Sequence, residues 1–239
     1  MPPMTEDPGN RAVADGMPPI PGGTGLSFSV SEEGLSLTDG TVSLRGDFAC
    51  LLPRIAPGRI GGESLVRAAK LRSALPGGPF AIDATAGLGE DSFLLAAAGF
   101  RVLMFEKDPV IAALLFDALC RAADDPRLKE IASRMTLVRG DSVAGMRELR
   151  TRPDIILLDP MFPERRKSGL TKKKMQLLGR LEAPAGSEEQ TALLNAATAA
   201  SPQRIIIKRP EKGEFLGGIK PSYSIPGSTV RYDCIVFPV

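Results

Sequence analysis

The chain has 239 residues and contains no histidine, which removes several kinds of chemistry at once. Ser-His-Asp and Cys-His nucleophiles and histidine-ligated metal centres are excluded. The three cysteines, Cys50, Cys120 and Cys234, show no Cys-x-x-Cys spacing, so we expect neither a disulfide framework nor a cysteine-rich metal site. A proton acceptor must therefore be a carboxylate, a backbone carbonyl or water, and the cysteine usage favours a cytoplasmic protein.

Long apolar runs and a strong net charge are also missing. No segment approaches the ~20 apolar residues of a membrane span, and residues 1–25 lack the pattern of a secretion signal, so we interpret them as a flexible leader. The net charge is +2, so only local clusters could indicate nucleic-acid binding. A hydrophobic content of 43% with 24% charged residues predicts one α/β domain with a modest appendage.

The appendage is predicted in residues 26–60. Apolar residues alternate from Leu26 to Leu44, and Glu33-Gly34 and Asp39-Gly40 stand where hairpin reversals would fall. We therefore expect a small antiparallel β unit at 26–60, followed by the main domain at 61–239.

Four short apolar runs in the main domain each lead to a carboxylate: Asp83, Glu106, Asp141 and Asp159. Segments with helical periodicity separate the runs, which predicts a Rossmann-like α/β fold with a mostly parallel sheet. The carboxyl ends of parallel strands meet at one edge, where open α/β sheets bind ligands. A fifth strand is expected at 204–208 and a C-terminal antiparallel hairpin at 222–237, with helices at 64–75, 90–98, 109–123, 142–149 and 187–200.

The segment from Asp83 to Gly89 predicts a tight turn into a helix. Gly87 and Gly89 would let the backbone approach a ligand closely. The pattern could also be a structural turn or the start of a dinucleotide fingerprint, but the third glycine of that fingerprint would fall at Ser92, which counts against NAD. Asp83 would add an acceptor for the cationic amino group of a methionine-derived sulfonium ligand.

The next two strand ends offer further acceptors. Glu106 could bind both ribose hydroxyls of a nucleoside, or it could be a solvated charge with Lys107 beside it capping the edge. Asp141 and Ser142 follow the third strand, where an adenine amino group would lie, although Asp141 could simply cap the next helix. In combination with the glycine turn, these residues favour nucleoside binding.

Asp159-Pro160-Met161-Phe162 is the most specific motif. An amine on a planar ring is a poor nucleophile because its lone pair is delocalised. Asp159 and the carbonyl of Pro160 can each accept one N–H, which turns the lone pair outward without a strong base. Proline fixes extended geometry at Asp159, and Phe162 offers a face on which a base can stack, although a plain turn with a buried Phe is the alternative.

A basic cluster follows this motif, with Glu164 as its one acid. It could bind phosphates flanking a target base, or it could be a solvated helix face. We expect Lys208 and Arg209, at the end of the fifth strand, to extend the basic rim. The cluster itself comprises Arg165, Arg166, Lys167, Lys172, Lys173, Lys174 and Arg180.

In these motifs the chain resembles the bacterial small-subunit ribosomal RNA (guanine-N2) methyltransferase family, often called RsmJ. The shared sequences run in order from about Gly61 to Asp233: Asp-Ala-Thr-Ala-Gly-Leu-Gly-x-Asp, Glu-Lys-Asp-Pro, Leu-Asp-Pro-Met-Phe-Pro, Lys-Ser-Gly-Leu-x-Lys-Lys-x-Met, Lys-Arg-Pro and Arg-Tyr-Asp. Residues 1–50 lie outside the resemblance, and Thr85 stands where class I enzymes often have glycine.

The resemblance implies a class I methyltransferase fold, S-adenosyl-L-methionine as the methyl donor and a guanosine of 16S rRNA, free or in the small ribosomal subunit, as the acceptor. A base in duplex RNA would first have to be unstacked. The resemblance also places the following residues around the donor: Glu90, Asp91, Glu106, Lys107, Asp141, Ser142 and Asp159.

Other functions remain open on the residues alone. The Asp-Pro-x-aromatic signature also serves methyltransferases that act on adenine N6 or on protein glutamine. An NAD-dependent reductase would lack both the third glycine and a Tyr-x-x-x-Lys proton donor. A non-catalytic RNA-binding module could use the basic cluster, but it would have no reason to place Asp159 beside it.

Overall fold

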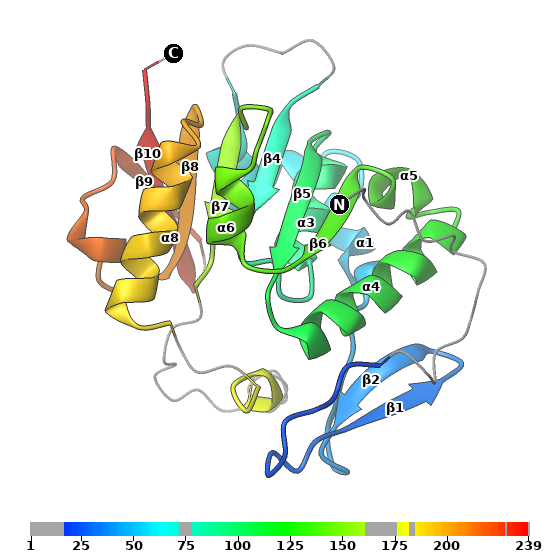
Figure 1. The fold of residues 1–239 in the computed structure, drawn as a ribbon. Helices are drawn as coiled ribbons and strands as arrows, with labels where there is room; N and C mark the ends of the chain where they lie inside the picture. The colour runs from blue at the N-terminus through cyan, green and yellow to red at the C-terminus, as the bar shows by residue number, and fades with distance from the viewer. Residues whose placement is uncertain (1–16, 72–77, 161–175, 182–184, 228, 239) are drawn as a thin grey trace.

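The computed structural model describes residues 17–71, 78–160, 176–181, 185–227 and 229–238 (Figure 1). Its centre is a seven-stranded sheet with the order β6-β5-β4-β7-β8-β10-β9, in which the first five strands are parallel and β10 runs antiparallel to β8 and β9. This arrangement confirms the predicted Rossmann-like α/β fold with its C-terminal hairpin. The strands are β4 Phe80–Asp83, β5 Arg101–Glu106, β6 Met135–Arg139, β7 Ile155–Leu158, β8 Arg204–Pro210, β9 Tyr223–Pro226 and β10 Val230–Val236.

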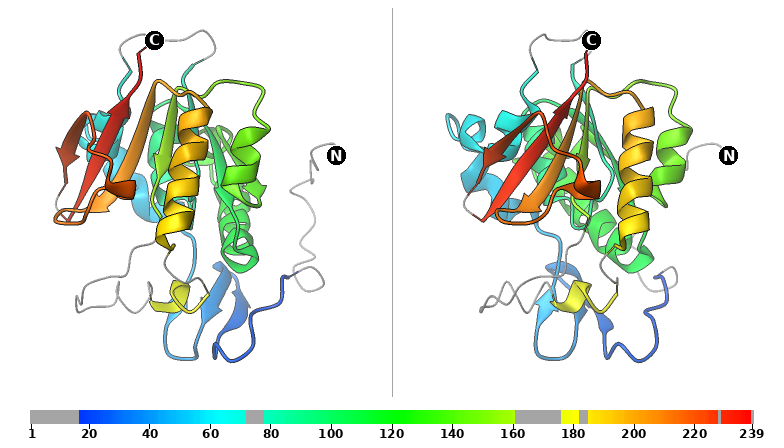
Figure 2. Two further views of the ribbon diagram at one scale, coloured as in Figure 1. Left: turned by 60° about the vertical axis from the view of Figure 1, so that its left-hand side comes forward. Right: turned by 90° about the vertical axis from the view of Figure 1, so that its left-hand side faces the viewer.

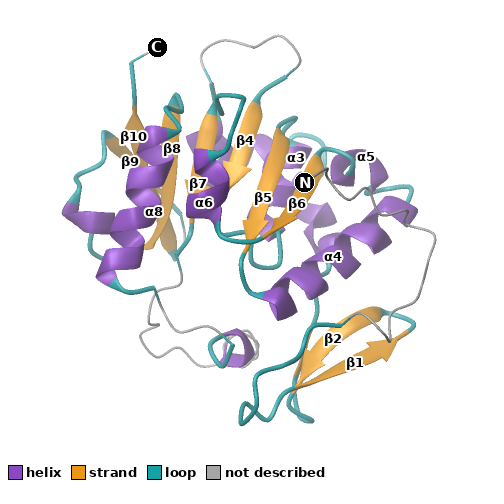
Figure 3. Cartoon of the chain, in the orientation of Figure 1, coloured by secondary structure: helices purple, strands orange, loops and turns teal. Residues whose placement is uncertain are grey.

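Helices cover both faces of this sheet (Figures 2 and 3). One apolar cluster joins α2 (Ser64–Ala69), α3 (Glu90–Ala97) and α4 (Pro109–Asp124) to one face, and a second joins α6 (Ser142–Arg147) and α8 (Ser187–Ala199) to the other. The residues of β7 alternate between the two clusters, so the whole strand is buried. Burial on both faces explains why β7 is a continuous apolar run in the sequence.

The helix boundaries differ from the expectations in small ways. The first predicted helix, 64–75, ends at Ala69, because Lys70 already has extended geometry. The last begins at Ser187 with Gly186, and not Ser187, as its N-cap; the Glu189 carboxylate accepts the Gly186 N–H at 3.0 Å. Short helical segments were not expected: Phe48–Leu51, α1 Leu52–Ile55, Ile60–Gly62, α5 Lys129–Ala132 and Leu216–Gly218.

The predicted N-terminal β unit is also confirmed. It is a three-stranded antiparallel sheet of β1 (Ser27–Ser31), β2 (Gly34–Thr38) and β3 (Ser43–Leu44), which lies beneath α4 at the end of the molecule (Figures 1 and 2). Residues 1–16 of the expected leader lie outside the described residues, while Met17 and Ile20 pack against the cluster beneath α4. That cluster comprises Leu35, Leu37, Leu44, Val110, Ile111, Leu114, Leu177 and Leu178.

Polar and aromatic contacts also join this unit to the main domain. The Leu35 N–H donates to Asp117 Oδ2 at 3.1 Å, and the ring of Phe48 stacks on that of Phe93 with centroids 4.9 Å apart. The division at residue 60 stays a prediction, but residues on its two sides share an apolar core. Among the described residues, no helix is long and apolar enough to cross a membrane.

Candidate functional site

A cavity of about 330 Å³ opens at the carboxyl ends of the parallel strands. It lies where β4 and β7 are neighbours, the point from which the chain builds the sheet outward in opposite directions. Open α/β sheets bind ligands at such a switch point. We call one side the β4–β6 wall, formed by Ala84, Thr85, Gly87, Glu106, Lys107, Asp141 and Ser142. The other side is the β7–β8 wall, formed by Asp159 and Pro160 with Lys208 behind them.

The two glycines of the turn after β4 serve different purposes. Both have positive φ, 55° at Gly87 and 78° at Gly89. Gly87 lines the cavity, and its N–H donates to Glu106 Oε2 at 2.8 Å. Gly89 does not line the cavity; a Cβ there would lie 2.6 Å from Leu115 Cδ1 and 3.2 Å from Phe48 Cζ. Gly87 thus shapes the cavity, and Gly89 allows α3 to pack closely.

Glu106 is buried and faces the cavity. Its two oxygens accept the N–H groups of Gly87 and Asp108, at 2.8 and 2.9 Å. A carboxylate can accept several hydrogen bonds, so these amides orient Glu106 without excluding hydroxyl donors from a ligand. Lys107 lines the cavity beside it.

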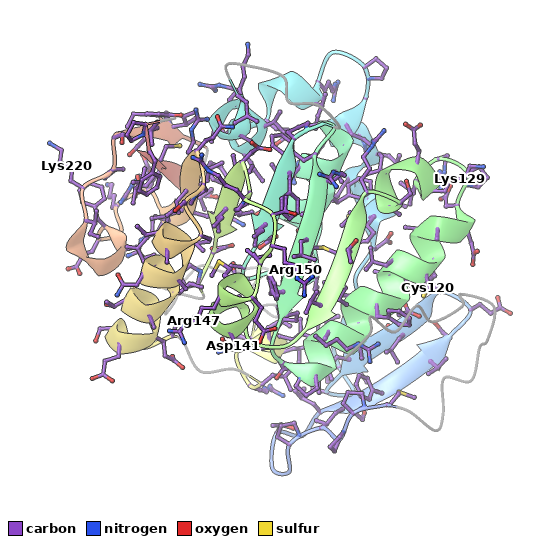
Figure 4. The ribbon with its side chains drawn as sticks, turned by 45° about the horizontal axis from the view of Figure 1, so that its top comes forward. Cys120, Lys129, Asp141, Arg147, Arg150 and Lys220 are labelled. Atoms are coloured by element: carbon purple, nitrogen blue, oxygen red, sulfur yellow. The ribbon has the colours of Figure 1, made fainter. Side chains whose placement is uncertain are left out.

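Asp141 combines the two roles that the sequence left open. It stands at the start of α6 (Figure 4), where its Oδ1 accepts the Ala144 N–H at 2.9 Å as the N-cap, and it also lines the cavity. Ser142 lines the cavity next to it. Behind them, Gly145 brings α6 onto β5 so closely that a Cβ would lie 2.2 Å from Phe105 Cε1.

Asp83 lies beneath the glycine turn and does not line the cavity. Its Oδ1 accepts the Thr85 N–H at 3.1 Å, and its Oδ2 accepts the Ser92 hydroxyl at 2.7 Å. Burial raises the pKa of Asp83 to about 7, although the hydrogen bond from Ser92 acts in the opposite direction. Ser92, at the missing third glycine, therefore holds the carboxyl group that supports the turn.

Glu90 and Asp91 begin α3, and neither lines the cavity. Asp91 is linked to the other wall by Lys208, whose Nζ lies 2.6 Å from Asp91 Oδ2 and 2.9 Å from Asp159 Oδ2. The expected basic rim at Lys208 and Arg209 thus requires correction. Lys208 is paired with two carboxylates and Arg209 is buried, because β8 is an inner strand covered on both faces.

Asp159 is fixed at two points. Its backbone N–H donates to Thr85 Oγ1 at 2.7 Å, and its Oδ2 faces the Lys208 ammonium. Withdrawal from solvent raises the pKa of Asp159, and the nearby Lys208 charge opposes that rise. Pro160 lines the cavity next to it. Phe162 and the basic residues Arg165, Arg166, Lys167, Lys172, Lys173 and Lys174 lie outside the described residues.

The far end of the segment that follows Asp159 returns to the cavity. Leu178 lines it and, with Leu177, packs against the N-terminal sheet and α4. A guanidinium nitrogen of Arg180 lies 3.4 Å from Oδ2 of Asp39, the residue directly after β2. The N-terminal unit therefore supports one side of the cavity.

Sequence reasoning missed Thr85 as part of the site, and it expected Lys208 on the basic rim without its pairing to Asp91 and Asp159. Thr85 showed only as a departure from a common glycine, and 117 residues separate Lys208 from Asp91 along the chain. Within the part of the chain that the structure describes, no cluster of side chains could hold a metal ion. The cavity therefore has the carboxylates of Glu106 and Asp141 on one wall, and Asp159 with Pro160 on the other.

Comparisons with known proteins agree with this geometry. The family described as "Putative SAM-dependent methyltransferase" matches residues 38–237. The ribosomal RNA small subunit methyltransferase J of Thioalkalivibrio sulfidiphilus is 41% identical over 222 residues, 90% of this chain and 86% of that protein. The protein of the same name from Pseudomonas aeruginosa is 45% identical over 178 residues, 73% of this chain and 67% of the relative. The crystal structure of a SAM-dependent methyltransferase from Neisseria gonorrhoeae covers 90% of this chain, and this chain covers 84% of it, with a TM-score of 0.71 and 31% identity.

Proposed function

The chain belongs to the ribosomal RNA small subunit methyltransferase J family of SAM-dependent methyltransferases, and from this premise we propose that it methylates the exocyclic N2 amine of a guanosine in 16S rRNA. Membership of this family makes the chain an enzyme, so neither an NAD-dependent reductase nor a non-catalytic RNA-binding module fits. The proposed substrate accords with the cytoplasmic location that the cysteine usage favours.

The chemistry of the β4–β6 wall suits S-adenosylmethionine, which supplies a methyl group on a sulfonium centre. Glu106, held by two amides, would bind the ribose hydroxyls, and Asp141 would accept from the adenine amino group. Gly87 leaves room for close approach of the ligand, because a Cβ there would meet no atom of the described residues within 4 Å. Thus the acceptors and the open backbone of this wall fit a nucleoside.

The β7–β8 wall supports the methyl acceptor, and Asp159 at the cavity is the observation that carries the proposal. Its carboxylate and the carbonyl of Pro160 would each accept one N–H of the guanine N2 amine. Those two bonds would turn the nitrogen lone pair toward the methyl carbon. As the C–N bond forms, the carbon–sulfur bond of the donor would break and release S-adenosylhomocysteine, and Asp159 would stabilise the positive charge left on the nitrogen. Asp159 or water then takes the surplus proton, and Phe162 would stack on the base.

The basic residues that follow would bind the RNA backbone. Replacing Lys172, Lys173 and Lys174 together by alanine should weaken RNA binding and flatten its dependence on salt, because fewer counterions would be released. Unchanged salt dependence would make these lysines ordinary surface residues.

Mass spectrometry of rRNA nucleosides tests the function. 16S rRNA, both free and in the small subunit, is incubated with S-adenosylmethionine and either the protein or its Asp159→Ala variant, and the modified nucleoside is mapped. We expect N2-methylguanosine at one position only with the intact protein. N6-methyladenosine, or methylation of protein glutamine alone, would contradict the assigned acceptor.

A further inference from the structure

The β7–β8 wall contains an ion-paired chain that the proposed chemistry has not yet used. Lys208 Nζ lies between Asp91 Oδ2, at 2.6 Å, and Asp159 Oδ2, at 2.9 Å. The three side chains come from α3, from β8 and from the residue directly after β7, so these ion pairs link separate elements of the fold. Each side chain is mostly withdrawn from solvent, with between 17% and 34% exposed.

We propose that Lys208, held in place by Asp91, is a positioning residue that fixes the Asp159 carboxylate and reserves one of its oxygens for the amine of the substrate. The inference rests on the proposed function. Because Oδ2 of Asp159 is bound to the ammonium group, Oδ1 is the oxygen that would accept the substrate N–H. With Thr85 holding the backbone N–H of the same residue, the carboxylate is restrained from two directions.

The charges explain why a lysine is needed here. Asp159 stands in a partly buried site beside a second carboxylate, Asp91, and both burial and like charge favour the protonated acid. A protonated Asp159 would present a donor to an amine that must donate, so the proposed orientation would fail. Lys208 opposes both effects on the pKa of Asp159. In turn, the two carboxylates hold the pKa of Lys208 well above its ordinary value, so it stays charged.

Asp91 has a double effect. It holds the ammonium group, but its own negative charge raises the pKa of Asp159. Removing Lys208 and removing Asp91 should therefore move the titration of Asp159 in opposite directions. A merely structural contact would give no such opposition. Among the residues that the structure describes, the charged and titratable groups around Asp159 are Lys208 and Arg209 on β8, Asp91 on α3, Asp83 on β4 and Tyr232 on β10.

The test is an NMR titration of the protein alone, with the aspartate carboxyl carbons labelled with ¹³C. In Lys208→Met we expect the pKa of Asp159 to rise by about one unit or more, since a close cation is lost. In Asp91→Asn we expect it to fall, and Lys208→Arg should restore a value near that of the native protein. Lys129→Met, at an exposed lysine on α5 far from the cavity (Figure 4), is the matched control and should change nothing.

Single-turnover methyl transfer across pH supplies the second readout. In the native protein the rate should rise with pH as Asp159 loses its proton, and this rise is the acid limb of the pH–rate profile. In Lys208→Met the acid limb should move to higher pH. Below the limb, the rate of the variant should be about tenfold lower than that of the native protein for each pH unit of the shift. Donor affinity by calorimetry should stay within about twofold, since Lys208 lies on the acceptor side of the cavity. If the limb belonged to Asp83, it would disappear in Asp83→Asn.

An Asp159 titration that is unmoved in Lys208→Met, or moved the same way in both variants, would overturn the proposal. Because the titration needs no RNA, this result is separate from failure of the proposed function, which would show as absence of N2-methylguanosine with the native protein.

Discussion

Carboxylates on the two walls of the cavity are held by different partners. On the β4–β6 wall, Glu106 and Asp141 accept hydrogen bonds from main-chain amides that lie within a few residues or in the adjacent turn. On the β7–β8 wall, Asp159 is held by the Lys208 side chain, which also reaches Asp91 on another element. Main-chain amides orient a carboxylate but carry no net charge. The ammonium group of Lys208 orients the Asp159 carboxylate and also favours its ionised form.

The difference suits the separate demands of the two ligands. A nucleoside has to be recognised by shape and hydrogen bonds, for which fixed amides and oriented carboxylates are sufficient. A reacting amine acquires positive charge, so the group opposite it must be anionic at the moment of reaction. If this comparison is right, variants on the first wall should alter binding and stability, and those on the second should alter rate.

The largest effect is expected for Asp159→Asn, which keeps the shape of the side chain but removes its charge and pairs an amide with Lys208. Methyl transfer should fall by about a hundredfold to ten-thousandfold, since a positioned acceptor contributes on this scale. Donor affinity, measured by calorimetry, should change little. A near-native rate would contradict the claim that the carboxylate on the β7–β8 wall must be charged for methyl transfer.

A large effect on stability is expected at Asp83, which has no cation comparable to Lys208 among its described neighbours. Its folded pKa of about 7 lies above the ordinary value of 3.8, so the folded state retains a proton that the unfolded chain releases. This contribution is fully present below pH 3.8 and is lost as pH rises through about 7, at a cost of roughly 4 kcal/mol in the free energy of unfolding.

Asp83→Asn should therefore flatten the pH dependence of unfolding between about pH 4 and 7, as measured by urea denaturation. Asp124→Asn, at an exposed acid near the end of α4, is the control and should keep the native slope. An Asp83→Asn variant with the native slope would mean that another group titrates in this range.

Glu106→Gln tests the amide cradle directly. One of its two oxygens becomes an NH₂ group that must face the N–H of Gly87 or Asp108. An unsatisfied buried N–H group costs about 1–3 kcal/mol. The affinity for S-adenosylmethionine should therefore fall by roughly ten- to hundredfold. Glu32→Gln, in an exposed turn, is the matched control. A lower rate of methyl transfer with unchanged donor affinity would contradict the assigned role of Glu106 in binding.

The smallest effect is expected for Gly145→Ala. The new methyl group would meet the ring of Phe105, which lines the cavity. Alanine favours the helix by about 1 kcal/mol, but the cost of overpacking should be larger. The free energy of unfolding should therefore fall by about 1–2 kcal/mol in total. Thermal unfolding and donor calorimetry should both report the loss. Gly22→Ala, where a Cβ would meet no atom of the described residues within 4 Å, should be neutral.

The same contrast separates what the sequence predicts from what it does not. The strand order and the β4–β6 wall follow from local signals, because Gly87, Glu106 and Asp141 stand directly after strands whose ends must meet at one edge. Asp159 and Pro160 were predictable for the same reason. The basic character of Lys208 was visible, but the direction of its side chain depends on which face of β8 each residue occupies and on what α3 offers there.

The position of Asp83 was harder to predict. Its place before a glycine turn is equally compatible with a ligand contact and with a support under the turn. The structure distinguishes them through the hydrogen bonds of the carboxyl group, which accepts the hydroxyl of Ser92, in the first turn of α3, and the N–H of Thr85. Likewise, nothing local shows that Leu177 and Leu178 would pack against a sheet more than a hundred residues earlier in the chain.

That packing has a practical consequence for anyone shortening the chain. A chain that began at residue 61, the boundary that composition suggests, would lack the N-terminal sheet that packs against Val110, Ile111 and Leu114 of α4. Leu177 and Leu178 would lose the same packing partners. The shortened protein would expose an apolar surface next to the cavity, because Leu178 lines the cavity and also belongs to the apolar cluster beneath α4. Exposed apolar surfaces of this kind promote aggregation. The minimal working unit therefore includes the small sheet, which acts as a buttress for the chamber.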